Sequence, residues 1–176
     1  VNTGLQGYWK MGDGINDEFP VIYDQTNPTN GAELFVNGSF TGVANGTDVI
    51  TLSGWSAYGS PTSRNVVDNK LVIVASGGNQ GALYSLGSLS GTYKLSVDVT
   101  GDTGAGGLYI AAAANYNITT LVGTLEYYFV ASGNTIIYFR AAGNSAGTTS
   151  YTNISVREVN GNPATMTNMV EGNITN

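Results

Sequence analysis

The chain has 176 residues, a formal net charge of −6 at pH 7 and only 10% charged residues, with 25 glycines, no cysteine and no histidine. The acidic balance argues against nucleic-acid binding, which needs a basic face, and against docking on an anionic membrane. No apolar run approaches the ~20 residues that a membrane span requires, so we expect no membrane insertion. Without cysteine or histidine there is no disulfide, no thiolate site and no Ser-His-Asp triad.

Short apolar runs that alternate with polar residues, bounded by Gly, Asn and Ser, predict strands along most of the chain. The predicted strands are residues 34–37, 49–52, 65–67, 70–75, 80–86, 92–99, 107–113, 125–130, 135–141 and 153–159. The clearest lies at Thr92 to Val99, where apolar residues occupy every second position. About ten short strands separated by tight turns predict an all-β fold, an antiparallel β-sandwich or jelly roll.

Composition changes near both ends of the chain. Residues 1–31 contain two of the four prolines, and residues 160–176 are rich in Asn, Thr and Gly. We therefore expect an N-terminal arm at 1–31, a compact domain at 32–159 and a C-terminal arm at 160–176. The arms are expected to pair with one another or with another protomer. Their apolar and aromatic residues, flanking a charge-poor domain, predict a homo-oligomer whose symmetry no repeat reveals.

Five motifs in order resemble those of jelly-roll carbohydrate-binding modules of the family 4 and 9 type. They are Glu33-Leu34-Phe35-Val36-Asn37-Gly38-Ser39-Phe40, Gly54-Trp55, Val66-Val67-Asp68-Asn69-Lys70-Leu71-Val72-Ile73, Gly91-Thr92-Tyr93-Lys94-Leu95-Ser96-Val97-Asp98-Val99 and Thr152-Asn153-Ile154-Ser155-Val156-Arg157-Glu158-Val159. The resemblance implies a jelly roll with carbohydrate-binding groups on its concave sheet.

A second resemblance concerns the arms. The segments Gly7-Tyr8-Trp9-Lys10-Met11-Gly12-Asp13-Gly14, Pro20-Val21-Ile22-Tyr23-Asp24 and Thr165-Met166-Thr167-Asn168-Met169 are similar to segments of phage virion proteins that carry concanavalin-A-like or laminin-G-like domains. It implies a phage particle, with the jelly roll inserted between Asn27-Pro28 and Asn162-Pro163.

Alternation selects a candidate glycan-binding face, because sugar binding needs aromatic faces and a few hydrogen-bonding side chains. If the apolar residues of 107–113 and 135–141 face the core, Tyr109, Tyr138 and Arg140 face outward. In 80–86, Gln80 and Tyr84 share a face. These five residues form the predicted platform. The alternative is that the tyrosines are ordinary sheet-surface residues, which strands favour in any case.

Trp55 and Tyr58 form a second candidate, because they lie in a Gly/Ser/Pro-rich segment that is expected to be a loop. A sugar platform at the loop tip is one interpretation. Packing of Trp55 into the protein is the preferred one.

The carbohydrate-binding resemblance also implies a structural Ca²⁺, held by oxygen ligands near the first and last strands. The matching candidates are Glu33, Asn37 and Asn153. Thr152 stands where the family has an Asp, which removes one charge from the site. No cofactor is required by the predicted function.

Catalysis is not expected. A glycosidase needs two carboxylates facing each other about 5–10 Å apart, and the 12 acidic residues are scattered along the chain. The sequence therefore favours a non-catalytic module on the virion surface that binds host-surface polysaccharide and other virion proteins. Two alternatives stay open: a purely structural virion domain that mediates assembly, and a secreted or surface adhesin module of a bacterium.

Overall fold

The computed structural model describes residues 21–23, 29–101, 107–119, 122–141, 146–160 and 163–165. The chain divides into two units, one of residues 33–156 and one that combines residues 1–32 with residues 157–176. The predicted all-β class is confirmed, because strands and turns make up nearly all of the described chain. None of the described segments is a helix long and apolar enough to cross a membrane.

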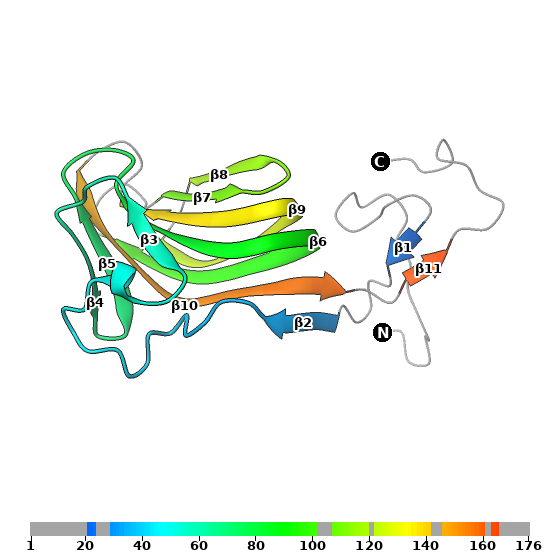
Figure 1. Cartoon of the computed structure of the whole chain (residues 1–176), viewed down its shortest axis with the longest axis horizontal. Coiled ribbons are helices and arrows are strands. Elements are labelled where there is room, and N and C mark those ends of the chain that lie inside the picture. Colours follow the sequence, from blue (N-terminus) through cyan, green and yellow to red (C-terminus); the bar gives the residue numbers. More distant parts are fainter. Residues whose placement is uncertain are drawn as a thin grey trace. The chain divides into compact units, whose positions relative to one another are not determined.

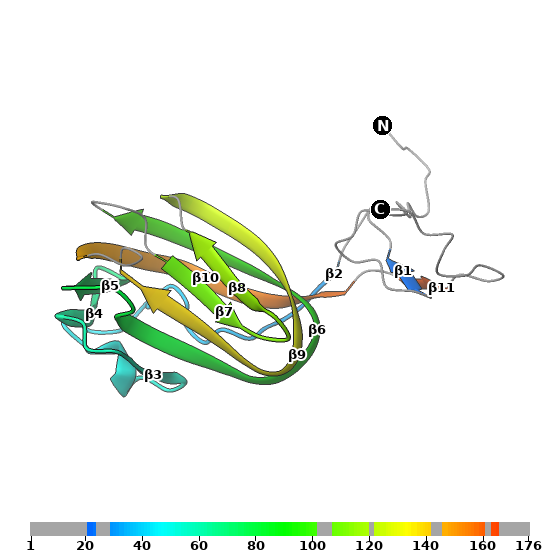
Figure 2. The same cartoon turned by 90° about the horizontal axis from the view of Figure 1, so that it is seen from above.

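Nine strands form one antiparallel sheet that folds over on itself into a jelly-roll sandwich (Figures 1 and 2). They are β2 (Thr29–Glu33), β3 (Trp55–Tyr58), β4 (Ser63–Val67), β5 (Lys70–Ala75), β6 (Gly81–Gly101), β7 (Gly107–Ala111), β8 (Asn115–Thr119), β9 (Gly123–Arg140) and β10 (Gly147–Asn160). The main path runs β4-β5-β10-β6-β9-β7-β8, while β2 pairs with β10 and β3 with β6.

The long strands β6 and β9 pair with each other through both layers. At one end of this hairpin, β6 is flanked by β3 and β9 by β7. Towards its other end, β6 is flanked by β10. The two strands approach closely there: a Cβ added at Gly101 of β6 would lie 3.0 Å from the carbonyl oxygen of Thr148 on β10. Figure 2 shows both strands curving from one layer into the other.

A β-bulge lies at the bend of β6. The register with β9 shifts between Ser85, which pairs with Ile136, and Gly87, which pairs with Thr135, so Leu86 is an extra residue on β6. An extra residue reverses which side chains face inward, because the strand has a period of two. Even-numbered residues such as Ala82 are therefore buried before the bulge, and odd-numbered ones such as Leu95 after it.

The core of the sandwich is built around aromatic rings. The Phe35 and Tyr84 rings stack with centroids 4.1 Å apart, and Trp55 meets Tyr84 edge-on at 5.2 Å. The ring centroids of Phe139 and Trp55 lie 5.2 Å apart. Phe40, which follows the turn after β2, packs its ring against Trp55. Such pairs add to the stabilisation from apolar burial. The first motif of the sequence thus contributes two core rings from a segment that follows β2.

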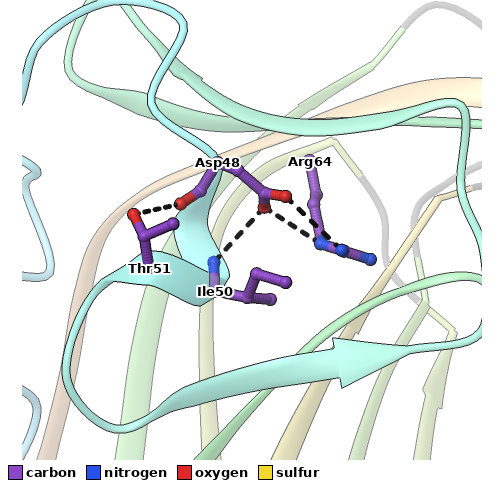
Figure 3. Close-up of polar contacts among 4 residues, drawn as sticks. All are labelled: Asp48, Ile50, Thr51 and Arg64. Carbon is purple, nitrogen blue, oxygen red and sulfur yellow. Dashed lines mark hydrogen bonds and ion pairs between the residues drawn. The ribbon is translucent and has the colours of Figure 1, made fainter.

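Two predicted strands have a different conformation. Residues 34–37 lie in the turn region after β2, and residues 49–52 contain a short 3₁₀ helix at Val49–Thr51. Asp48 caps this helix: its Oδ1 accepts hydrogen bonds from the Ile50 amide (3.3 Å) and from Arg64 Nε (3.0 Å), and the Thr51 hydroxyl donates to the Asp48 carbonyl (2.8 Å; Figure 3). The cap and the ion pair favour the 3₁₀ helix over a strand, and an alternating pattern of apolar residues does not reveal either contact.

In the other unit, β1 (Val21–Tyr23) pairs antiparallel with β11 (Pro163–Thr165). The two arms of the sequence therefore pair with one another, which was one of the two expected arrangements. Apart from these two strands, the segments that resemble phage proteins lie outside the described residues.

The aromatic core predicts unequal costs for two tyrosine truncations. Tyr84→Ala removes a ring that is 4% exposed and stacked on Phe35, so we expect it to lower the free energy of unfolding by about 3 kcal/mol or more. Tyr128→Ala removes a ring that is 41% exposed, and we expect a loss below ~1 kcal/mol. Urea denaturation of both variants measures this difference. Equal losses would contradict the placement of Tyr84.

Candidate functional site

The candidate site is the outer face of the layer formed by β3, β6, β9, β7 and β8. Two cross-strand rows run over it, because the registers align residues of neighbouring strands. One row is Ser56, Leu83, Tyr138, Tyr109 and Asn117; the next is Tyr58, Gly81, Arg140 and Gly107. Beneath them Leu108, Ile137 and Phe139 are fully buried. The sheet thus presents polar and aromatic groups on one side and a dry core on the other.

Three tyrosines form a continuous aromatic row on this face. The Tyr58 and Tyr138 centroids lie 4.8 Å apart with their planes at 74°, and those of Tyr109 and Tyr138 lie 5.3 Å apart at 67°. All three side chains are partly exposed. Tyr58 reaches Tyr138 from two strands away because Gly81, on the strand between them, has no side chain. Tyr138 is therefore the central ring, in contact with both others.

Arg140 lies beside this row. Its Cζ is 5.8 Å from the Tyr109 centroid. Nη2 donates to Asn117 Oδ1 at 2.7 Å, Nε donates to the Gly107 carbonyl at 3.3 Å, and Nη1 reaches Asn79 Oδ1 at 3.5 Å. These partners are neutral oxygens, so they orient the guanidinium without neutralising its charge.

Two glycines make room for this arrangement. A Cβ at Gly107 would lie 2.9 Å from Arg140 Nη2, so the guanidinium occupies the space that any other residue would fill. A Cβ at Gly81 would lie 1.9 Å from the Phe139 carbonyl oxygen, which no backbone adjustment tolerates cheaply. At both positions the strand holds a glycine because neighbouring atoms lie too close to leave room for a side chain.

The expected position of Tyr84 on this face is wrong. Its side chain is 4% exposed and packs against Phe35, and its hydroxyl accepts a hydrogen bond from the Val36 amide at 3.3 Å. The reason is the bulge at Leu86, which reverses the inward parity of β6. A ring in this position offers no face to a sugar.

The other predicted residues divide between core, loop and site. Trp55 and Tyr58 lie in strand β3 rather than in a loop. Trp55 is 7% exposed and belongs to the aromatic core, as its preferred interpretation had it. Gln80 ends the loop before β6, where its Oε1 accepts from the Ser76 amide at 3.1 Å. Tyr58, Tyr109, Tyr138 and Arg140 are brought together.

The three candidate calcium ligands each have protein partners. Glu33 Oε1 accepts hydrogen bonds from the amides of Phe35 (2.9 Å) and Val156 (2.8 Å), and the side-chain amide of Asn37 closes a turn with the backbone of Thr41. Asn153 donates to Asp98 Oδ2 at 2.7 Å. Within the described part of the chain, no three acidic side chains gather to form a metal site. Calcium at these residues stays a prediction.

Sequence reasoning missed Asn117 and Asn79, the two side-chain partners of Arg140. Asn117 lies on β8, a strand that was not predicted. Its alternation was visible in Asn115 to Thr119, where Tyr116 and Ile118 face inward and Asn117 outward, but the run is short and polar. Asn79 has a φ of +57° in the loop before β6, and only its position in space relates it to Arg140.

Comparison with known proteins finds no matching family model and no matching curated protein. Among solved structures, a CBM4 carbohydrate-binding module is similar at 16% identity and a TM-score of 0.45, covering 69% of this chain and 97% of its own. The second N-terminal cellulose-binding domain of a Cellulomonas fimi β-1,4-glucanase C has the same identity and score, covering 73% and 95%. An arabinose-bound α-L-arabinofuranosidase scores 0.47 at 18% identity, covering 80% of this chain and 28% of its own.

The contact between Asn153 and Asp98 gives a test of the role of Asn153. Hydrogen bonds from the Thr124 hydroxyl and the Asn153 amide lower the pKa of the Asp98 carboxyl. A lowered pKa stabilises the fold above the pKa of the unfolded chain, and this contribution is lost as the pH falls through the folded pKa. Asn153→Gly, which suits the local φ of +51°, should raise the Asp98 pKa and reduce this acid sensitivity.

Carboxyl-carbon NMR titration measures the Asp98 pKa directly. Asn37→Gly is the matched control, since Asn37 also has a φ of +51° but bonds only to its own turn. An unchanged Asp98 pKa in Asn153→Gly would show that the amide is not the donor.

Proposed function

We propose that the chain is a non-catalytic module that binds glycans through the outer face of β3, β6, β9 and β7. The adjacency of three partly exposed tyrosine rings, whose hydroxyls are unbonded within the described part of the chain, carries this proposal. The hydroxyls of Tyr84, Tyr116 and Tyr151 all bond to the protein backbone. Those of Tyr58, Tyr109 and Tyr138 have no partner among the described residues. Three adjacent rings thus combine a partly exposed face with an unused hydroxyl, which is the combination that sugar recognition needs.

The angles between the rings favour one form of glycan over another. Neighbouring planes are inclined at 74° and 67°, so the row is not a flat platform on which an extended crystalline surface could lie. A single glycan chain can instead follow the row, with one pyranose ring against one tyrosine face and its hydroxyl groups near the next. We therefore propose individual polysaccharide chains as the ligand.

A further polar group for hydrogen bonding borders the row. The Nδ2 of Asn117, which pairs across the strands with Tyr109, has no partner among the described residues, because the bond of this side chain is made by its oxygen. This amide donor beside three hydroxyls provides a further directional contact at the Tyr109 end of the row.

The Asp98 carboxyl does not suit the role of a glycosidase general acid. A general acid of a glycosidase needs a raised pKa. The Asp98 carboxyl shows the opposite shift, because hydrogen bonds from Thr124 and Asn153 favour its ionised form. The tyrosine row itself offers stacking and hydrogen bonding, neither of which breaks a glycosidic bond.

The proposed setting is the surface of a phage particle, where such a module would hold the particle to host polysaccharide. This setting is supported by the sequence resemblance of the arms, and the β1–β11 pair joins two of the resembling segments. A purely structural virion domain is the alternative. It would leave the tyrosine row without a ligand, so glycan binding separates the two.

Tyr138→Ala is the sharpest test, because this ring contacts both Tyr58 and Tyr109. On a glycan array followed by calorimetric titration of the bound glycan, we expect its affinity to fall by about tenfold, or ~1.4 kcal/mol, with the fold intact. Tyr128→Ala removes a partly exposed tyrosine of the same strand from the other layer and should bind as the wild type does.

A folded wild-type chain that binds no glycan would overturn the proposed function. Equal losses in the two variants would move the binding surface away from the tyrosine row.

A further inference from the structure

Arg140 differs from Arg64 and Lys94, two cations that form ion pairs in the described part of the chain. Arg64 Nε lies 3.0 Å from Asp48 Oδ1, and Lys94 Nζ lies 2.6 Å from Glu126 Oε1. Arg140 has no carboxylate within ion-pair distance among the described residues, although the chain carries an excess of acidic groups. Its partners are carbonyl and amide oxygens. Among the described residues its charge is therefore held in place but not compensated.

The guanidinium is also fixed in one position. Its shortest contact, 2.7 Å to Asn117 Oδ1, comes from β8, and its Nε contact comes from the Gly107 carbonyl on β7. The opposite nitrogen, Nη1, has only the 3.5 Å contact to Asn79, which leaves donor capacity on that side. Holding a planar fork in advance reduces the entropy lost when it binds a second planar group.

We propose that Arg140 recognises a carboxylate on the glycan, so that the ligand of this face is an acidic polysaccharide containing uronic acid residues. This inference rests on the proposed glycan binding and names the class of its ligand. Charge-assisted hydrogen bonds between guanidinium and carboxylate are the strongest that such a fork makes. Arg140 Cζ lies 5.8 Å from the Tyr109 centroid. The guanidinium lies over the Tyr109 ring, so a sugar bound along the neighbouring rings of Tyr109 and Tyr138 can direct a carboxylate towards it.

The net charge of −6 acts against this recognition, since it repels an anionic polymer. At physiological ionic strength the Debye length is about 8 Å, so acidic groups farther away are largely screened. Contact with the Arg140 guanidinium is much shorter than this length and is screened less. The local cation therefore determines the preference.

The test is a glycan array read with the full chain at 0.15 M salt, a condition at which the Debye length is about 8 Å. Each uronate-containing oligosaccharide is printed beside its carboxyl-reduced counterpart, which has the same linkages and no charge; sulfated oligosaccharides form a third set. We expect at least one uronate glycan to bind about tenfold more tightly than its reduced counterpart.

Three variants assign this preference to Arg140. Arg140→Gln should bind both members of the pair equally, at the level of the reduced glycan. Gly107→Ala keeps the arginine but places a Cβ 2.9 Å from Nη2, so the guanidinium must shift and the ratio should fall. Arg64→Gln removes the same charge from an arginine that is already paired with Asp48, and it should keep the full preference.

The outcomes separate the two proposals. Equal or tighter binding of the reduced glycans, or an unchanged ratio in Arg140→Gln, would overturn carboxylate recognition and leave glycan binding in place. Binding of sulfated glycans alone would overturn the carboxylate as the recognised group. Failure of the folded wild type to bind any glycan, acidic or neutral, would overturn the proposed function itself.

Discussion

The pairing of β6 with β9 is the constraint on which the rest of the structure depends. These two strands pass through both layers. Strands β3 and β10 are hydrogen-bonded to β6, and β7 is hydrogen-bonded to β9. The hairpin bends between the layers, and β6 carries a bulge at the bend, because an extra residue bends the strand that holds it and reverses its inward parity. This extra residue is Leu86, while β9 keeps its odd-numbered residues inward from Phe129 to Phe139. The bulge thereby assigns Tyr84 to the core and leaves Tyr138 outside.

The outer face follows from this assignment. Once Ile137 and Phe139 point inward, Tyr138 and Arg140 must point outward, and the registers with β7 and β3 bring Tyr109 and Tyr58 beside them. Gly81 and Gly107 pair with Arg140 on its two sides. Because Gly107 has no side chain, the Arg140 guanidinium occupies the space above it. Stacking surface, unused hydroxyls and one uncompensated cation then meet on a single face. The proposed binding function and the proposed preference for acidic chains rest on the same local geometry.

Much of the fold could be predicted from the sequence, since alternation and turn residues report which face of a strand is buried. They indicated the all-β class and the outward positions of Tyr109, Tyr138 and Arg140 correctly. They failed for Tyr84, because a single inserted residue changes parity without any change in composition. They also missed the ion pair of Asp48 with Arg64 and the contact of Asn79 with Arg140, which join residues 16 and 61 positions apart. Alternation carries no information about such distant partners.

The central claim is that the outer face around Tyr138 is the binding surface, and NMR titration with a glycan ligand tests it most directly. Amide and side-chain signals of Tyr58, Tyr109, Tyr138 and the Arg140 guanidinium should shift together and saturate at one ligand concentration. Signals of Lys94, Glu126 and Tyr128, which lie together on the opposite layer, should stay in place. Shifts confined to that second group, with an unperturbed tyrosine row, would contradict the account.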